Sequence, residues 1–179
     1  MEKKILITGP GKCGTTFLVQ LLTYCGVDTG YTPETFQQSL DKTGAGGEWN
    51  ISQKGLPTPY IIKNPGFCIH LSGTAAWHEW EVEHVYVCMR PYDQILAHQK
   101  DQAQYDANVL LLFTGIATHV GQLMEHLVFR DIPYTIVKFP NIVKDPKYCY
   151  EKILPLINIR YDEFLKIYNR VADLKKVHY

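Results

Sequence analysis

Short apolar runs along the chain alternate with longer stretches in which apolar residues recur at helical spacing. The runs predict buried strands at residues 3–8, 60–63, 84–89 and 134–139. The longer stretches predict helices at residues 15–25, 34–40, 92–104, 108–130, 147–157 and 161–176. Strands that alternate with helices are typical of a parallel sheet covered on both faces. We therefore expect an α/β fold of three layers around a mainly parallel sheet of about four or five strands.

A glycine-rich loop follows the first predicted strand. Residues 9–16 read Gly-Pro-Gly-Lys-Cys-Gly-Thr-Thr and lead into the first predicted helix. Strand, glycine-rich loop and helix in this order open a P-loop fold, in which backbone N–H groups and the helix dipole bind phosphate. In nucleoside triphosphatases a lysine directly follows the last glycine of this loop. Here Thr15 holds that position and Lys12 lies earlier, so the loop predicts a phosphate site unlike that of a kinase.

The length and composition favour one globular domain spanning residues 1–179. Hydrophobic residues make up 46% of the chain and charged residues 20%, which excludes the composition of a disordered protein. Lys and Arg together number 18 and so do Asp and Glu, so no global basic field would attract nucleic acid or a membrane surface. No apolar run approaches the ~20 residues that span a bilayer. We expect neither nucleic acid nor membrane among the partners.

The cysteines indicate the compartment. There are 5, an odd number, and no two of them form a Cys-x-x-Cys pair that would suggest zinc or a redox motif. Reduced thiols are the ordinary state in the cytoplasm. The sequence therefore predicts a cytoplasmic protein.

Cations stand at the ends of the predicted strands. Lys12, Lys63 and Arg90 follow the first three strands, and Lys138 lies within the last one. Ligands of open parallel sheets bind outside the carboxyl ends of the strands. No predicted strand ends in the aspartate that holds magnesium in a nucleoside triphosphatase. The expected site is cationic and metal-free.

The glycine-rich loop resembles that of a known family. Residues 11–16, GKCGTT, are similar to the PKSGTT or PRSGTT loop with which sulfotransferases bind a 5′-phosphosulfate. Lys12, Gly14, Thr15 and Thr16 match this loop, whereas Gly11 and Cys13 replace its usual proline and serine. The resemblance implies 3′-phosphoadenosine 5′-phosphosulfate as cofactor, bound by residues 11–16. It also implies that Lys12 bonds the bridging oxygen and stabilises charge on the leaving phosphate.

A second motif resembles the 3′-phosphate site of the same family, in which a serine follows an arginine after eight residues. The sequence Arg90-Pro91-Tyr92-Asp93 begins this motif and keeps the interval, but His98 stands in place of the serine. The resemblance implies that Arg90 and His98 bind the 3′-phosphate. Histidine can donate a hydrogen bond to phosphate, and its titration near neutrality would make that contact depend on pH. The alternative is that His98 lies on a helix surface.

A third motif resembles tyrosylprotein, heparan and many bacterial sulfotransferases. Lys63-Asn64-Pro65 is similar to their Lys-x-Pro element, in which the lysine faces the transferring sulfuryl group. Residues 134–153 resemble their last strand and the following turn more loosely, because Phe139-Pro140 replaces the usual Tyr-Glu. The resemblance assigns Lys63 to catalysis.

A sulfotransferase also needs a base that takes the proton of the acceptor. Glu34 lies 18 residues after Thr16, about where tyrosylprotein and heparan sulfotransferases carry a catalytic glutamate, and it is our first candidate. Glu48 and His70 are the alternatives. The predicted catalytic set is thus Lys12, Glu34 and Lys63.

Three functions remain open from the sequence. The first is a sulfotransferase that transfers a sulfuryl group to a hydroxyl or amine. The second is a P-loop kinase of a nucleotide or small molecule, disfavoured by Thr15 and by the missing aspartate. The third is a non-catalytic nucleotide-binding module, suggested by Cys13, by His98 and by the absence of the Gly-x-x-Gly-x-x-Lys loop of cytosolic sulfotransferases. The acceptor pocket is expected in loops, at residues 28–59 and around 66–82; neither acceptor nor oligomeric state is predicted.

Overall fold

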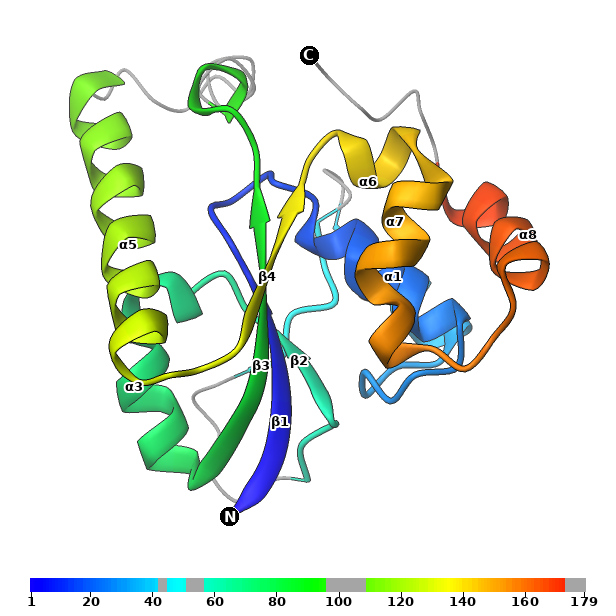
Figure 1. The fold of residues 1–179 in the computed structure, drawn as a ribbon, viewed down its shortest axis with the longest axis horizontal. Coiled ribbons are helices and arrows are strands. Elements are labelled where there is room, and N and C mark those ends of the chain that lie inside the picture. Colours follow the sequence, from blue (N-terminus) through cyan, green and yellow to red (C-terminus); the bar gives the residue numbers. More distant parts are fainter. Residues whose placement is uncertain (42–44, 51–56, 96–108, 173–179) are drawn as a thin grey trace.

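Four parallel strands form the centre of the protein (Figure 1). The structure is a computed structural model that describes residues 1–41, 45–50, 57–95 and 109–172. The strands lie in the order β2-β1-β3-β4, and every neighbouring pair is parallel. Their bounds are Glu2–Thr8 for β1, Ile61–Lys63 for β2, Trp80–Met89 for β3 and Tyr134–Lys138 for β4. The predicted parallel sheet is confirmed.

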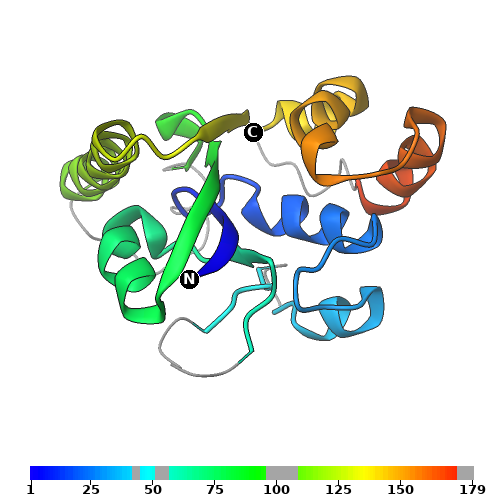
Figure 2. The same cartoon turned by 60° about the horizontal axis from the view of Figure 1, so that its bottom comes forward.

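Helices cover both faces of this sheet, as both views show (Figures 1 and 2). One face carries α3 (Phe67–His78) and α5 (Val109–Phe129). The other carries α1 (Thr15–Tyr24), α6 (Asn141–Lys144), α7 (Pro146–Ile153) and α8 (Tyr161–Val171). The short helix α2 (Pro33–Gln38) packs on α1, and a 3₁₀ turn (Leu154–Leu156) follows α7. The expected three-layer α/β fold is confirmed.

The core is divided by the sheet, because successive side chains of a strand point to opposite faces. Leu6, Ile62, Val85 and Val87 are buried against α3 and α5. Ile5, Ile7, Ile61, Tyr86 and Cys88 are buried on the side of α1, α7 and α8. Burial on both faces explains why the strands read as continuous apolar runs rather than as alternating ones.

The order of the strands fixes where a ligand can bind. From β1 the chain passes through α1 to β2 on one side, and through α3 it returns to β3 on the other side of β1. The crevice at the carboxyl ends of β1 and β3 is therefore the switch point at which open α/β sheets bind ligands. The glycine-rich loop lies at this point, since it follows β1 directly.

Two expectations from the sequence are wrong: the loop around residues 66–82 and the start of the third strand at residue 84. The region around residues 66–82 is not a loop, because it holds α3 and the beginning of β3. This helix is kinked at His70 (φ −122°, ψ 18°), and its polar and apolar residues do not separate into two faces, so it lacks the sequence signal of an amphipathic helix. Trp80 belongs to β3 and stacks on His78, with ring centroids 4.3 Å apart.

Within the described residues, no helix is long and apolar enough to cross a membrane.

Candidate functional site

The glycine-rich loop has a backbone that few residues can adopt. Gly9 and Gly14 have φ angles of 148° and 91°, and Lys12 lies in the left-handed region at φ 67°. A Cβ atom at Gly9 would lie 2.2 Å from the carbonyl oxygen of Cys88, so only glycine fits there. A lysine with positive φ is uncommon and typical of functional loops. The chain turns sharply over the ends of β1 and β3.

The N-terminus of α1 lies directly after this turn, at the end of the loop. Gly14 is the N-cap residue, and no side chain of the described chain caps the helix. The first N–H groups of a helix have no partner within the helix, and the helix dipole places partial positive charge on them. The predicted phosphate site therefore lies at a helix N-terminus without a side-chain cap.

Cys13 occupies the loop differently from a ligand-facing serine. Its side chain is fully buried, and the thiol donates a hydrogen bond to the carbonyl oxygen of Pro10. Burial raises the pKa of this thiol well above its ordinary value, so it stays neutral. The side chain therefore supports the turn from inside.

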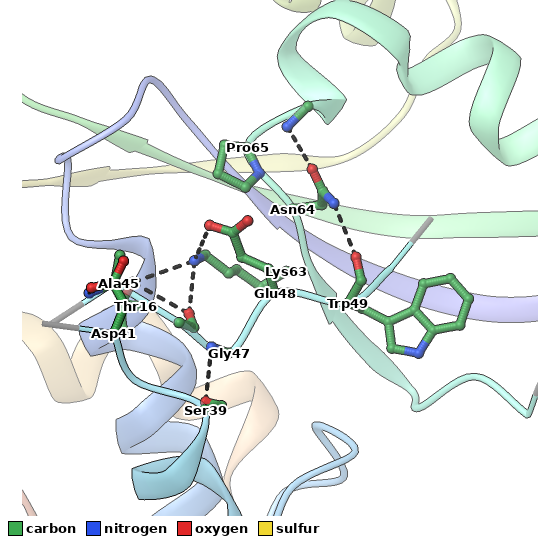
Figure 3. Close-up of polar contacts among 12 residues, drawn as sticks. Thr16, Ser39, Asp41, Ala45, Gly47, Glu48, Trp49, Lys63, Asn64 and Pro65 are labelled. Atoms are coloured by element: carbon green, nitrogen blue, oxygen red, sulfur yellow. Dashed lines mark hydrogen bonds and ion pairs between the residues drawn. The ribbon is translucent and has the colours of Figure 1, made fainter. Parts of the chain in front are cut away.

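Lys63 connects the end of β2 with the first turn of α1 (Figure 3). Its ammonium group donates to the Gly46 carbonyl oxygen (2.9 Å), to Oε1 of Glu48 (3.0 Å) and to Oγ1 of Thr16 (3.3 Å). The side chain of Lys63 is only 1% exposed, whereas that of Glu48 is 49% exposed. Burial lowers the pKa of Lys63, and the hydrogen bond that its ammonium donates to Glu48 opposes this effect. We name Lys63, Glu48 and Thr16 the lysine cluster.

The segment 45–50 brings Glu48 to the lysine cluster because its backbone is tied to β2. The N–H group of Trp49 donates to the carbonyl oxygen of Lys63 (3.0 Å), and the side-chain amide of Asn64 donates to the carbonyl oxygen of Trp49 (3.0 Å). Asn64 also accepts a hydrogen bond from the N–H group of Gly66 (2.7 Å). Asn64, the middle residue of the Lys-x-Pro motif, therefore helps to position the segment 45–50.

Glycine is required where this segment turns. Gly47 has φ 66°, and a Cβ atom there would lie 2.4 Å from the ring of Phe36. Its N–H group donates to the hydroxyl of Ser39 (3.1 Å), which follows α2. The glycines at residues 46 and 47 thus have a positional role, since the turn there lets Glu48 reach Lys63.

Arg90 lies on the other side of the loop, directly after β3. It is 6% exposed, and its guanidinium donates to the carbonyl oxygen of Lys12 (3.3 Å) and to the side chain of Gln94 (3.2 Å). The same group lies 4.8 Å above the ring of Phe139, a cation–π contact. Burial lowers its pKa, which stays far above neutrality for an arginine. Phe139 also fills the space beside Gly14, where a Cβ atom would be 2.7 Å away.

The structure brings most of the predicted cations together. Lys63 and Arg90 both reach the loop that carries Lys12, because Lys63 donates to the Thr16 hydroxyl and Arg90 to the main-chain carbonyl oxygen of Lys12. Lys138 ends β4 with an exposed side chain, and its N–H group donates to the hydroxyl of Tyr148 (2.8 Å). His98 lies outside the described residues.

The described interactions of Glu34 are with its own helix α2, with the Thr32 cap and with Arg170, and none of them is with the loop. Glu34 is exposed in the first turn of α2, where hydrogen bonds from its own backbone and from Thr32 lower its pKa and Arg170 adds an attraction. The guanidinium of Arg170 lies 5.1 Å above the ring of Tyr24, the last residue of α1. At about 1.5 Å per residue, the 10 residues of α1 separate this end from the loop by roughly 15 Å. His70 is exposed at the kink of α3.

Two residues of the site were not our first candidates from the sequence. Glu48 was an alternative base, and its only sequence signal is the glycine-rich stretch before it. Phe139 was noted only as a replacement for tyrosine, although an aromatic residue at a strand end can support a neighbouring arginine. Among the described residues, no group of three His, Cys, Asp or Glu side chains is placed to hold a metal ion.

Comparisons with known proteins agree with this architecture at the level of the fold. No family model and no curated protein matches the chain. A solved structure, the sulfotransferase domain from the Synechococcus PCC 7002 olefin synthase, superposes with a TM-score of 0.57 at 16% sequence identity. The match covers 97% of this chain and 82% of that domain. The chain therefore has the fold of a sulfotransferase domain.

Proposed function

We propose that this protein is a sulfotransferase that moves a sulfuryl group from 3′-phosphoadenosine 5′-phosphosulfate to a hydroxyl or amine. The observation that carries the proposal is the lysine cluster beside the phosphate loop. A nearly buried lysine there reaches the first turn of the phosphate-binding helix and a half-exposed carboxylate at the same time. The fold and the loop, whose lysine precedes its last glycine, support the same activity.

The residues at the loop suit the parts of this co-substrate, which supplies the sulfuryl group. Main-chain N–H groups at the start of α1 and the hydroxyl groups of Thr15 and Thr16 would hold the 5′-phosphosulfate. Lys12 would stabilise the negative charge that develops on the bridging oxygen when the sulfur–oxygen bond breaks. Arg90, with His98, would bind the 3′-phosphate.

The geometry favours Glu48 over Glu34 as the base. Glu48 lies 3.0 Å from Lys63 and reaches solvent, so it can meet both the sulfuryl group and an acceptor. In the transfer, the acceptor oxygen forms a bond to sulfur and the bond from sulfur to the bridging oxygen breaks. Glu48 takes the proton of the acceptor, and the bridging oxygen keeps the electron pair beside Lys12. Lys63 donates hydrogen bonds to the sulfuryl oxygens.

Titration calorimetry without metal tests the co-substrate. We expect adenosine 3′,5′-bisphosphate to bind more tightly than ADP, and Lys12→Ala to weaken its binding by about 10-fold, the effect of one lost charge-assisted hydrogen bond. Tight binding of magnesium-ATP without binding of the bisphosphate would instead establish the kinase function. Bisphosphate binding without transfer to any acceptor would identify a non-catalytic nucleotide-binding module.

A pair of matched variants tests the base. We expect Glu48→Gln to lower the rate of sulfuryl transfer by about 10²-fold or more, the usual contribution of a positioned base. Glu34→Gln makes the same chemical change in α2 and should leave the rate within about 2-fold, as for a surface residue. The opposite result would return the role to Glu34.

A further inference from the structure

The outer edge of β4 carries backbone groups that the sheet does not use. Phe139 and Pro133 both bond β3, the first through its N–H group and the second through its carbonyl oxygen. In a parallel ladder the two backbone groups of a residue point to the same side, and successive residues alternate between the two sides. Tyr134 and Ile136 therefore turn their N–H and C=O groups away from β3, and no hydrogen bond joins these groups to any described residue.

The outward N–H groups on either side of this stretch are already engaged. After it, the N–H group of Lys138 donates to the hydroxyl of Tyr148 (2.8 Å). Before it, the N–H group of Ile132 donates to the carbonyl oxygen of Leu127 (2.9 Å). The open part of the edge is therefore short, and residues 134 and 136 bound it.

Apolar side chains stand beside these open backbone groups. Tyr134 and Ile136 are each 39% exposed, and they alternate with the buried Val137, which packs on the side of α1, so they lie on the face that carries α5. On α5, Val128 is 54% exposed and lies about 200° around the helix from His126, which lines the groove toward α3. Exposed apolar side chains next to an open strand edge mark a surface that pairs with another chain.

We propose that β4 pairs with β4 of a second copy of this chain, antiparallel about a two-fold axis that passes through Thr135. In this register Tyr134 of each copy lies opposite Ile136 of the other, and each such pair exchanges both of its N–H···O=C bonds. The pairing uses every outward group of the open stretch and needs neither of the engaged N–H groups of Lys138 and Ile132. An aromatic residue opposite a β-branched one is also a favourable cross-strand pair. A surface that matches itself in this way gives a closed dimer.

The charges along the edge favour a second copy in this direction. Asp131 and Lys138 are both exposed, one before and one after the open stretch. Antiparallel pairing about Thr135 brings Lys138 of each copy beside Asp131 of the other, so that opposite charges meet at both ends. Arg130 lines the groove toward α3 and lies outside this contact. The chain has a net charge of 0, so two copies do not repel each other as a whole.

Sedimentation velocity of the full chain tests the association, which does not depend on the proposed catalytic function. We expect a dimer at about 100 μM that dissociates on dilution, as for interfaces at the small end of the known range. Amide hydrogen exchange followed by NMR locates the contact. The N–H groups of Tyr134 and Ile136 should exchange at least about 10-fold more slowly in the dimer than in the dilute protein, whereas that of Lys138, bonded within each copy, should change by less than about 2-fold. A monomer at this concentration, or a dimer in which the first two amides keep their rates, would overturn the proposal.

Matched variants test the register. Ile136→Glu sets a carboxylate against the ring of Tyr134 of the second copy and should raise the dimer dissociation constant by about 10-fold or more. Leu154→Glu makes a similar change at a residue that is 47% exposed in the turn after α7, and it should leave the constant unchanged. Lys138→Glu sets like charges side by side and should raise the constant by about 3-fold, less so at high salt.

Thermal unfolding shows whether each variant folds. Should Ile136→Glu fail to fold, amide exchange of the wild type and the salt dependence of Lys138→Glu decide the question. A folded Ile136→Glu that dimerises as tightly as the wild type would exclude β4 from the interface.

Discussion

Lys63 and Arg90 lie on opposite sides of the glycine-rich loop, are almost equally buried, and are held in different ways. Lys63 is 3% exposed and bonds a carboxylate, a hydroxyl and a carbonyl oxygen, all through one ammonium group. Arg90 is 6% exposed, lies on the ring of Phe139 and donates to the main chain of Lys12. The first cation is surrounded by exchangeable polar partners, and the second is packed between an aromatic ring and the loop.

This difference indicates different roles for two residues that look alike in the sequence. The three partners of Lys63 lie on separate elements, so the ammonium can exchange one of them for a substrate oxygen without disturbing the fold. The planar group of Arg90 supports the residue with positive φ at the centre of the loop, so its loss alters the loop itself. Lys63 should therefore matter chiefly for turnover and Arg90 for binding.

The largest expected effect is that of Lys63→Met on turnover. Methionine fills the same space without donors, so we expect the transfer rate to fall by about 10²- to 10³-fold, as for loss of a transition-state hydrogen-bond donor. The bisphosphate affinity should stay within about 3-fold. Rates are measured with saturating co-substrate.

Lys138→Met is the control for this prediction, because the exposed side chain of Lys138 also stands at the end of a strand. It should retain the wild-type rate. A Lys63→Met variant that lost bisphosphate affinity but kept its rate at saturation would contradict the assignment of Lys63 to turnover and of Arg90 to binding.

A smaller effect is expected for Arg90→Lys. Lysine keeps the charge but loses the planar group over Phe139 and the fixed geometry toward Lys12, so we expect the bisphosphate Kd to rise by about 10-fold, near 1.4 kcal/mol. The rate at saturation should change less than the affinity. Arg130→Lys, at the exposed residue that follows α5, is the control in the same calorimetric titration. An unchanged Kd for Arg90→Lys would show that charge alone suffices there.

The smallest effect concerns stability against pH. The pKa of Lys63 is lowered by burial from its ordinary value of 10.5, so the folded protein binds fewer protons than the unfolded chain between the two values. The unfolding free energy should therefore rise with pH in the window that ends near 10.5. Each unit of lowering corresponds to about 1.4 kcal/mol.

Urea unfolding of the wild type and of Lys63→Met over this pH window measures the contribution of Lys63 to the unfolding free energy, because the other titrating groups are common to both proteins. The difference in unfolding free energy should grow with pH in favour of the wild type. A constant difference would mean that the bond to Glu48 offsets the effect of burial on the pKa of Lys63, and a falling one that it outweighs burial.

The sequence predicted the sheet and the position of its cations because both depend on local patterns. Apolar runs define the strands, and the residue after a parallel strand must lie at the ligand-binding end. Lys63 and Arg90 could therefore be placed before any contact was known. The helix α3 was not predicted because its apolar and polar residues are mixed along a kinked helix, so that the sequence shows no helical periodicity there.

The carboxylate of the site could not be chosen from spacing alone. Glu34 has the expected interval after Thr16, but α2 begins at Pro33, after the Thr32 cap, and leaves Glu34 exposed in its first turn, under the electrostatic influence of Arg170. Glu48 reaches Lys63 through contacts of Gly47, Trp49 and Asn64, each with a residue distant in the sequence. Such contacts arise from the tertiary fold and leave no periodic pattern.

The backbone bond between Trp49 and Lys63 has a consequence for association between molecules. β2 is an outermost strand, and such strands pair readily with strands of other chains. On the outer side of β2, the N–H group of Trp49 donates a hydrogen bond to the carbonyl oxygen of Lys63. The N–H group of Ile61 donates a hydrogen bond to the carbonyl oxygen of Asp28 (3.0 Å). The segment that supplies the carboxylate of the site therefore also shields this strand from edge-to-edge aggregation.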